Sequence, residues 1–406
     1  MNNKKIIMPQ DEWIYYPSFS SGNSRDWLLK NFPIDSNLTG RFYDPKFKDV
    51  SGFYHPYFLL SAGHCYKHKE LRKNMGLEDS LVFGDSGGYQ IATGAIKWDF
   101  KMRDQIFEWL ENNSDVAMNI DFPPFPGSLY EHKFDEALKI SKDNFQHFEK
   151  NQSGKTKFLN VLQTRLMDSE TLTWYDNVKD FNFKGWGIGG CRTLSKMMYQ
   201  TALFLDQKIW ENPNNEILHY LGITDIKSMI YLSILQKEYN KKFGQNKVVV
   251  SVDSSSPHLA TIYGGWYLGL NIKTLSLNSL SLAKKNSYDP MTKLPCFEEC
   301  PVCKGKNMEK LEEFKTLNSY LYMTCHNLCI FLKIIKQVTN IFKYDDIIIK
   351  DLLSKDVYES YCSIQEMFNS DNPMAVYKKY KQLYSKINLD DVFVSEEKIN
   401  EFFDIQ

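Results

Sequence analysis

The feature that most constrains the fold of this chain is a unit that recurs along residues 58–253. In each unit, a short apolar run ends in glycine or a polar residue, and a longer stretch with the spacing of an amphipathic helix follows. The run ends lie roughly 24 to 42 residues apart, which is the spacing of strand–helix units in a parallel barrel or a doubly wound sheet. The runs begin at Phe58, Leu81, Val116, Phe158, Trp186, Ile217 and Val248.

Several of these runs finish in residues that can take part in chemistry, namely Asp85, Asp121, Gln163, Gly189, Gly190 and Asp253. In a parallel barrel the carboxyl ends of the strands converge on one mouth, so these groups would meet in space. A doubly wound sheet would instead scatter them along a crevice. The convergence of these groups therefore favours a parallel barrel of strand–helix units.

The texture of the sequence changes after the barrel units. We expect residues 1–285 to form the barrel with an N-terminal extension, 286–335 a zinc-binding subdomain inserted in the fold, and 336–406 a helical C-terminal segment. The first 50 or so residues are rich in Tyr, Phe and Pro and have no clear period, so no element is assigned to them.

Charge and hydropathy restrict the function only broadly. The 49 Lys and Arg nearly balance the 50 Asp and Glu, which argues against a protein that coats nucleic acid indiscriminately. An enzyme whose basic groups are concentrated in one groove remains compatible with this charge balance. No apolar run approaches the roughly 20 residues needed to cross a bilayer, and no secretory leader is evident. We expect a soluble, cytoplasmic protein.

Two strand ends carry carboxylates that suit glycosidic chemistry. Asp85 lies in a Gly84–Gln90 segment with three further polar or aromatic residues, and Asp253 directly follows a β-branched run. Each aspartate alone could simply cap the next helix. Together at one barrel mouth, one could attack an anomeric carbon while the other handles the protons of the leaving group.

Other strand ends suit recognition of a planar base. A carboxylate at Asp121 can accept from purine N–H groups, and Gln163 offers both a donor and an acceptor, although a polar strand end is the simpler interpretation of Gln163. The glycines of 185–190 meet the spacing of a dinucleotide fingerprint, but they lie within the apolar run. Backbone N–H groups of Gly189 and Gly190 contacting a base are the better hypothesis.

A cysteine cluster indicates a metal site. Cys296, Cys300 and Cys303 with His326 supply three thiolates and an imidazole, the ligand set of a closed structural zinc site. Cys325 and Cys329 are rivals for the fourth position. A closed site leaves no coordination position for water, which argues against a zinc hydrolase. A thioredoxin-type redox pair lacks its strand–helix setting, and a deaminase signature is incomplete.

Taken in order, these motifs resemble those of tRNA-guanine transglycosylases over residues 57–330. The matching segments are 85–90, 114–121, 161–163, 188–190, 220–222, 252–253 and the metal cluster. The resemblance implies that Asp253 is the nucleophile and Asp85 the general acid and base. It also implies a base pocket made of Ser86, Tyr89, Asp121, Gln163, Gly189, Gly190 and Leu221. It further implies a (β/α)8 barrel with an inserted zinc-binding subdomain, no redox cofactor, and a homodimer formed through the zinc region as one possible assembly.

The chain departs from the tRNA enzymes in ways that favour a DNA substrate. Their nucleophile precedes a Leu-Pro-Thr-Arg-type segment, whereas here Ser254-Ser-Ser-Pro-His-Leu follows, and three residues separate the first two cysteines. The 61–64 and 253–256 segments look more like the DNA-modifying branch, which inserts 7-cyano-7-deazaguanine (preQ0) and is common in phages. In that match His64 lines the mouth; a capping or core histidine is the alternative. A tRNA substrate and a non-catalytic partner subunit remain the rival hypotheses.

Overall fold

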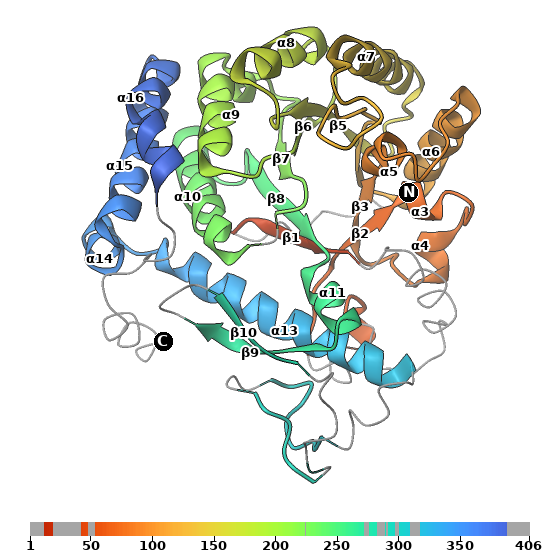
Figure 1. Ribbon diagram of the computed structural model, residues 1–406, viewed down its shortest axis with the longest axis vertical. Helices are drawn as coiled ribbons and strands as arrows, with labels where there is room; N and C mark the ends of the chain where they lie inside the picture. The colour runs from red at the N-terminus through yellow and green to blue at the C-terminus, as the bar shows by residue number, and fades with distance from the viewer. Residues whose placement is uncertain are drawn as a thin grey trace.

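Eight parallel strands form one sheet, in the order β1-β8-β7-β6-β5-β4-β3-β2. The strands are β1 Ile14–Pro17, β2 Tyr57–Ser61, β3 Leu81–Asp85, β4 Val116–Met118, β5 Lys157–Gln163, β6 Gly185–Gly189, β7 Ile217–Tyr220 and β8 Val249–Ser254. A parallel bridge between Ser18 and Leu59 joins β1 to β2 and closes the ring. The predicted (β/α)8 barrel is confirmed (Figure 1). The computed structural model describes residues 12–18, 42–47, 53–223, 225–271, 276–281, 289, 291–296, 300–308 and 317–387.

The first strand lies in the region to which the sequence assigned no element. β1 pairs with β8, with Tyr16 opposite Asp253. All four of its residues are buried. A strand of four residues that is buried on both faces shows no polar alternation, so periodicity does not reveal it. Its aromatic and β-branched composition is the only local signal.

Helices of the expected amphipathic kind connect the strands and surround them (Figure 1). They are α3 Ala62–Cys65 and α4 Leu71–Asn74 after β2, α5 Gly88–Ala92 and α6 Phe100–Asn113 after β3, α7 Phe134–Asn151 after β4, α8 Asp168–Val178 after β5, α9 Leu194–Asp206 after β6 and α10 Ile226–Phe243 after β7. Side-chain caps fix the start of three of them. Asp99, Thr193 and Asp225 accept from backbone N–H groups in the first turns of α6, α9 and α10.

The chain after β8 covers the seam between the last and first strands. The short helix α11 Ser256–Ile262 leads into an antiparallel hairpin of β9 Gly265–Asn271 and β10 Ser276–Ser281, and the long helix α13 Leu317–Ile341 follows. Phe331 of α13 packs against Tyr15 of β1 at a ring-centroid distance of 5.1 Å. Helix α13 therefore takes the place of the last barrel helix. It continues across residues 335 and 336, the expected boundary between the zinc-binding subdomain and the helical C-terminal segment.

Three further helices follow α13: α14 Asp346–Leu352, α15 Lys355–Asn369 and α16 Pro373–Lys386. They stand beside α9 and α10 in Figure 1. Tyr231 of α10 and Ser360 of α15 form a buried hydrogen bond of 3.1 Å. Lys381 of α16 reaches Asp168 at the start of α8, at 2.7 Å. Within the described ranges, no helix combines the length and the hydropathy needed to cross a membrane.

Aromatic side chains fill the barrel interior beneath its mouth. The ring of Phe83 stacks on that of His219 at 3.9 Å, and Tyr16 lies 5.2 Å from Phe83. Gly187 makes room for Met118, because a Cβ at residue 187 would lie 2.0 Å from the Met118 Cε atom. The barrel interior is thus filled with packed side chains, which lie beneath the residues at the strand ends and support them.

Candidate active site and metal centre

The predicted catalytic and base-binding residues lie at the carboxyl ends of the barrel strands or in the segments that directly follow them. Asp85 ends β3, Gln163 ends β5, Gly189 ends β6, and Asp253 is the penultimate residue of β8. Asp121 and Leu221 lie just beyond β4 and β7. The Asp253 carboxylate is close enough to raise the pKa of Asp85, and Asp85 likewise raises the pKa of Asp121. Three acids from three strands therefore share one mouth.

Asp85 is held by two donors from neighbouring segments. The Ser61 hydroxyl donates to its Oδ2 atom at 2.7 Å, and the Gly87 N–H donates to Oδ1 at 3.2 Å. Burial raises the pKa of the Asp85 carboxyl, and these two hydrogen bonds and nearby His64 only partly oppose the rise. Asp85 thus holds a proton at a higher pH than an ordinary aspartate, as a general acid should.

Asp253 is fixed through a single oxygen. The Gly222 N–H donates to its Oδ1 atom at 2.9 Å, and His219 Nε2 lies 3.2 Å from the same atom. The other ring nitrogen of His219 contacts the Ser251 hydroxyl at 2.9 Å. Within the described part of the chain, no hydrogen bond engages Oδ2 of Asp253. One oxygen is thus used for orientation, and the second carries a lone pair available for attack on an electrophile.

Sequence reasoning missed Ser61 as a partner of Asp85 and His219 as a partner of Asp253. His219 is a lone polar residue inside the apolar run of β7, and its side chain has no exposed surface. A buried histidine in a barrel strand was the available signal. Its partners became visible only with the register, which sets His219 beside Ser251 on the neighbouring strand.

Asp121 and Gln163 form a buried polar pair beside these carboxylates. Gln163 Nε2 donates to Asp121 Oδ2 at 2.5 Å. Gly189 allows this arrangement, because a Cβ there would lie 2.4 Å from Gln163 Nε2. Burial raises the pKa of the Asp121 carboxyl to about 7, although the Gln163 hydrogen bond opposes the shift. The pair offers a carboxylate and an amide to one planar ligand.

The raised pKa of Asp121 predicts that Asp121→Asn stabilises the protein at alkaline pH. An unfolded aspartate ionises near about pH 3.9, whereas folded Asp121 does so at about 7. The stability that its protonated form contributes is present below about pH 4 and is lost as the pH rises to about 7. At pH 8 the variant should gain up to about 4 kcal/mol in free energy of unfolding, because a pKa difference of this size corresponds to that amount and no buried charge remains.

Urea unfolding of Asp121→Asn and of the wild-type protein at pH 8 and pH 4.5 measures this effect. The gain should shrink at pH 4.5. Asparagine can still accept from Gln163, so the packing is preserved. The raised pKa of Asp121 is refuted if the variant is less stable than wild type at pH 8. It is also refuted if the free energy of unfolding changes by the same amount at both pH values.

Three further predicted pocket residues lie on the segments that follow β2 and β3. Tyr89 is 61% exposed, and its ring stacks on Phe125 at 5.2 Å with an interplanar angle of 6°. The Ser86 hydroxyl donates to the Asn119 carbonyl at 2.9 Å and is buried. His64 contacts the Gln90 amide at 3.1 Å. Tyr89 therefore presents an aromatic surface at the mouth, while Ser86 supports the strand ends.

Gly190 and Leu221, in the loops after β6 and β7, are the last two predicted pocket residues. Gly190 directly follows β6 and adopts a φ of +71°, which a residue with a side chain rarely adopts. The N–H of Leu221 donates to the Ile188 carbonyl at 3.0 Å, which ties the loop after β7 to β6. Leu221 itself is half-buried.

The four predicted metal ligands meet in one place. The donor atoms of Cys296, Cys300, Cys303 and His326 all lie within 4.8 Å of one another. Cys300, Cys303 and His326 are buried, and Cys296 is half-buried. The cluster can hold a metal ion.

The state of His326 fits a ligand. Its Nε2–H donates to the Tyr267 carbonyl at 2.7 Å, so Nδ1 carries the lone pair. That Nδ1 atom is buried and has no hydrogen-bond partner in the described structure. The ring also stacks on Trp266 at 3.5 Å and 9°. A carbonyl that orients the second nitrogen is the usual support of a metal-bound histidine.

The geometry also bears on the rival ligands Cys325 and Cys329. His326 belongs to the group of close donor atoms, whereas neither cysteine does. Cys329 nevertheless contacts Cys300. Cys325 is buried on the same helix, where burial and, to a smaller extent, Cys300 raise the pKa of its thiol. The predicted set of three cysteines and His326 is therefore the arrangement that the fold brings together.

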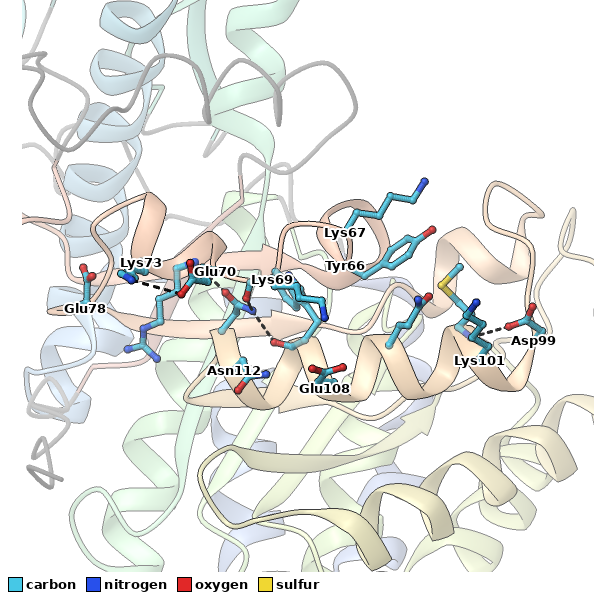
Figure 2. A pocket seen from close by; sticks show the side chains of 15 residues that line it. Tyr66, Lys67, Lys69, Glu70, Lys73, Glu78, Asp99, Lys101, Glu108 and Asn112 are labelled. Atoms are coloured by element: carbon cyan, nitrogen blue, oxygen red, sulfur yellow. Dashed lines mark hydrogen bonds and ion pairs between the residues drawn. The ribbon is translucent and has the colours of Figure 1, made fainter.

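Two cavities lie near the barrel wall. One of about 850 Å³ lies between the segment after β2 and helix α6, and none of the predicted site residues lines it. Figure 2 shows Lys67 and Lys69 of that segment above Glu108 and Asn112 of α6. The other, of about 330 Å³, lies between the loops after β6 and β7. It includes Gly222, the residue that holds Asp253, so it adjoins the mouth.

Comparison with known proteins adds no assignment. No model of a known protein family matches the chain, and no curated protein matches it.

Proposed function

We propose that this protein is a pentosyltransferase that exchanges guanine in DNA for a 7-deazaguanine base such as preQ0. The observation that carries the proposal is the grouping of Asp253, Asp85 and Asp121 at one barrel mouth, each affecting the next electrostatically. Their environments differ. Among the described residues, none forms a hydrogen bond with Oδ2 of Asp253, Asp85 retains a proton more readily than an ordinary aspartate, and Asp121 pairs with the amide of Gln163. Such a division of roles suits base exchange.

In the first half of the reaction, Asp253 Oδ2 attacks C1′ of the deoxyribose. The C1′–N9 bond breaks, and its electron pair passes to guanine. Asp85 delivers the proton that the departing guanine takes up. A covalent Asp253–deoxyribose ester remains, and Asp85 is left as a carboxylate. The N–H of Gly222 and the ring of His219 keep Asp253 aimed throughout.

In the second half, the incoming 7-deazaguanine occupies the place of guanine. Asp85 removes its N9 proton, N9 attacks C1′, and the ester bond to Asp253 breaks. The carboxylate of Asp253 and the proton on Asp85 are both restored, so the enzyme returns to its starting state. The cycle consumes no redox equivalent, because a glycosidic bond is broken and the same kind of bond is formed.

Base recognition falls to the buried polar pair and its neighbours. The ionised Asp121 carboxylate would accept from the N1–H and 2-amino group of a guanine-like edge. Gln163 and the backbone N–H groups of Gly189 and Gly190 would meet the carbonyl side. Both guanine and 7-deazaguanine present this edge, which is what an exchange reaction requires of a single pocket.

Tyr89 is predicted to stack on the nucleotide at the mouth. Removing the ring with Tyr89→Ala should weaken binding of an oligonucleotide by about tenfold, since stacking on an aromatic side chain is worth about 1–3 kcal/mol. Tyr89→Phe keeps the ring and should bind like wild type. Fluorescence anisotropy with a labelled oligonucleotide measures both. Equal affinity of the alanine and phenylalanine variants would remove Tyr89 from this role.

We propose that the metal is zinc and that its role is structural. Three thiolates and an imidazole fill a tetrahedral shell and suit Zn²⁺. The ion would link the loop after β10 to α13, which covers β1 and β8. It supplies no step of the reaction. A homodimer through this region remains a proposal.

The choice of DNA over tRNA rests on the sequence resemblance, and a tRNA substrate is the alternative. A DNA substrate would place the enzyme in the cytoplasm, that of the host if a phage encodes it. The test is incorporation of radiolabelled guanine into plasmid DNA and, separately, into tRNA. We expect incorporation into DNA. Incorporation into tRNA alone would contradict the proposed DNA substrate. Incorporation into neither nucleic acid would favour a non-catalytic partner subunit.

A further inference from the structure

Two arginines at the barrel mouth have no role in the exchange chemistry described above. Arg165 lies two residues beyond Gln163, and Arg192 lies two residues beyond Gly190. Both are exposed, and neither forms an ion pair within the described part of the chain. Asp168, an acid close to Arg165 in sequence, is already paired with Lys196 at 2.8 Å and with Lys381 at 2.7 Å. The mouth thus carries two arginines that form no ion pair with a described acid.

Arg165 is held in a defined place beside the base pocket. Its guanidinium lies over the ring of Phe125, 5.4 Å from the centroid, and Phe125 stacks in turn on Tyr89. Its stem packs against the loop after β6, where a Cβ on Gly190 would lie 2.7 Å from the Arg165 Cβ atom. Arg165 therefore borders the aromatic surface that Tyr89 presents.

Arg192 lines the cavity of about 330 Å³ next to the nucleophile. The same cavity is lined by Gly222, whose N–H binds Asp253. One acid, Asp225, also lines it, but its two carboxylate oxygens accept from the N–H and the hydroxyl of Ser228 at the start of α10. An anion that enters this cavity would therefore be attracted to the guanidinium of Arg192.

We propose that Arg165 and Arg192 bind backbone phosphates of the DNA strand next to the reacting nucleotide. This inference rests on the proposed function for the identity of the ligand. The protein has a formal net charge of −1, so it needs local cations to hold a polyanion. Guanidinium groups pair with phosphates through two parallel hydrogen bonds, and their fixed positions next to the pocket would set which nucleotide faces Asp253.

The test is fluorescence anisotropy of the full-length protein with a labelled guanine-containing DNA oligonucleotide over a range of salt concentrations. Arg165→Ala with Arg192→Ala should raise the dissociation constant at least about tenfold at low salt. The slope of log affinity against log salt should fall by about 2, since each phosphate contact contributes about 0.9. Replacing both arginines with lysine should restore part of the affinity.

The matched control removes two exposed lysines, Lys350 of α14 and Lys150 of α7, neither of which is ion-paired in the described structure. Lys150 lies in the last turn of α7, at the end of the barrel opposite the mouth. The control variant should bind like wild type. An arginine variant that binds like this control overturns the inference, and so does a loss of affinity for tRNA without one for DNA. Binding is measured without exchange. A missing exchange reaction with an intact arginine effect would therefore refute the proposed function alone.

Discussion

Asp253→Asn is expected to lower the rate of labelled guanine exchange by about a thousandfold or more, with the fold intact. The amide oxygen can still accept from Gly222, which lies 2.9 Å from the present carboxylate. It lacks the negative charge that an attacking oxygen needs at an oxocarbenium-like centre. Losses of this size are normal when a nucleophile is removed. Initial rates of exchange and a thermal melt of the same preparation measure the two quantities.

Asp99→Asn is the matched control. Asp99 caps α6 through a hydrogen bond from the Met102 N–H, outside the group of acids at the mouth, and asparagine caps a helix equally well. It should exchange guanine at the wild-type rate. If Asp253→Asn exchanges at the wild-type rate too, Asp253 is not the nucleophile.

Cys300→Ala is expected to abolish zinc binding and to destabilise the region around α13. Wild-type protein should contain one zinc ion per chain by elemental analysis, and the variant close to none. Loss of a structural metal is among the few single changes that cost more than about 4 kcal/mol. The effect should appear as faster hydrogen exchange in β9 and α13, because His326 of α13 binds the Tyr267 carbonyl of β9.

Cys362→Ala serves as the control, since Cys362 lies on α15 outside the group of donor atoms. It should retain the ion and the wild-type exchange pattern. Cys329→Ala separates the rival ligand sets, because it should also keep one zinc ion if His326 is the fourth ligand. A full complement of zinc in Cys300→Ala would contradict the assignment of the site.

The barrel was predictable because seven of its strands leave the same local signature. A buried parallel strand is a short apolar run, and its carboxyl end changes abruptly to glycine or polar residues, as at Asp85 and Gln163. β1 is no shorter than β4 or β7, but the sequence around it shows no helical period that would mark a strand–helix unit. Its partner β8 lies more than 200 residues away in sequence. Helix α13 was predictable as a helix, but its role as the cover of β1 depends on contacts such as Tyr15 with Phe331.

The site residues at the strand ends were predictable from the sequence, whereas the residues that hydrogen-bond to them were not. Spacing alone indicated the cysteine cluster, since metal ligands lie close together in sequence. The residues that position the acids, by contrast, do not lie close to those acids in sequence. Ser61 meets Asp85 through pairing of β2 with β3, and His219 meets Asp253 through pairing of β7 with β8. The raised pKa of Asp121 likewise follows from burial, which no local pattern encodes.

The most direct test of base exchange at this mouth is to trap the covalent intermediate. The protein is mixed with a guanine-containing DNA oligonucleotide without free base, denatured, digested, and mapped by mass spectrometry. We predict a deoxyribose-linked oligonucleotide on the peptide that contains Asp253, with release of one guanine per adduct. An adduct on another residue, or the same adduct in Asp253→Asn, would contradict it.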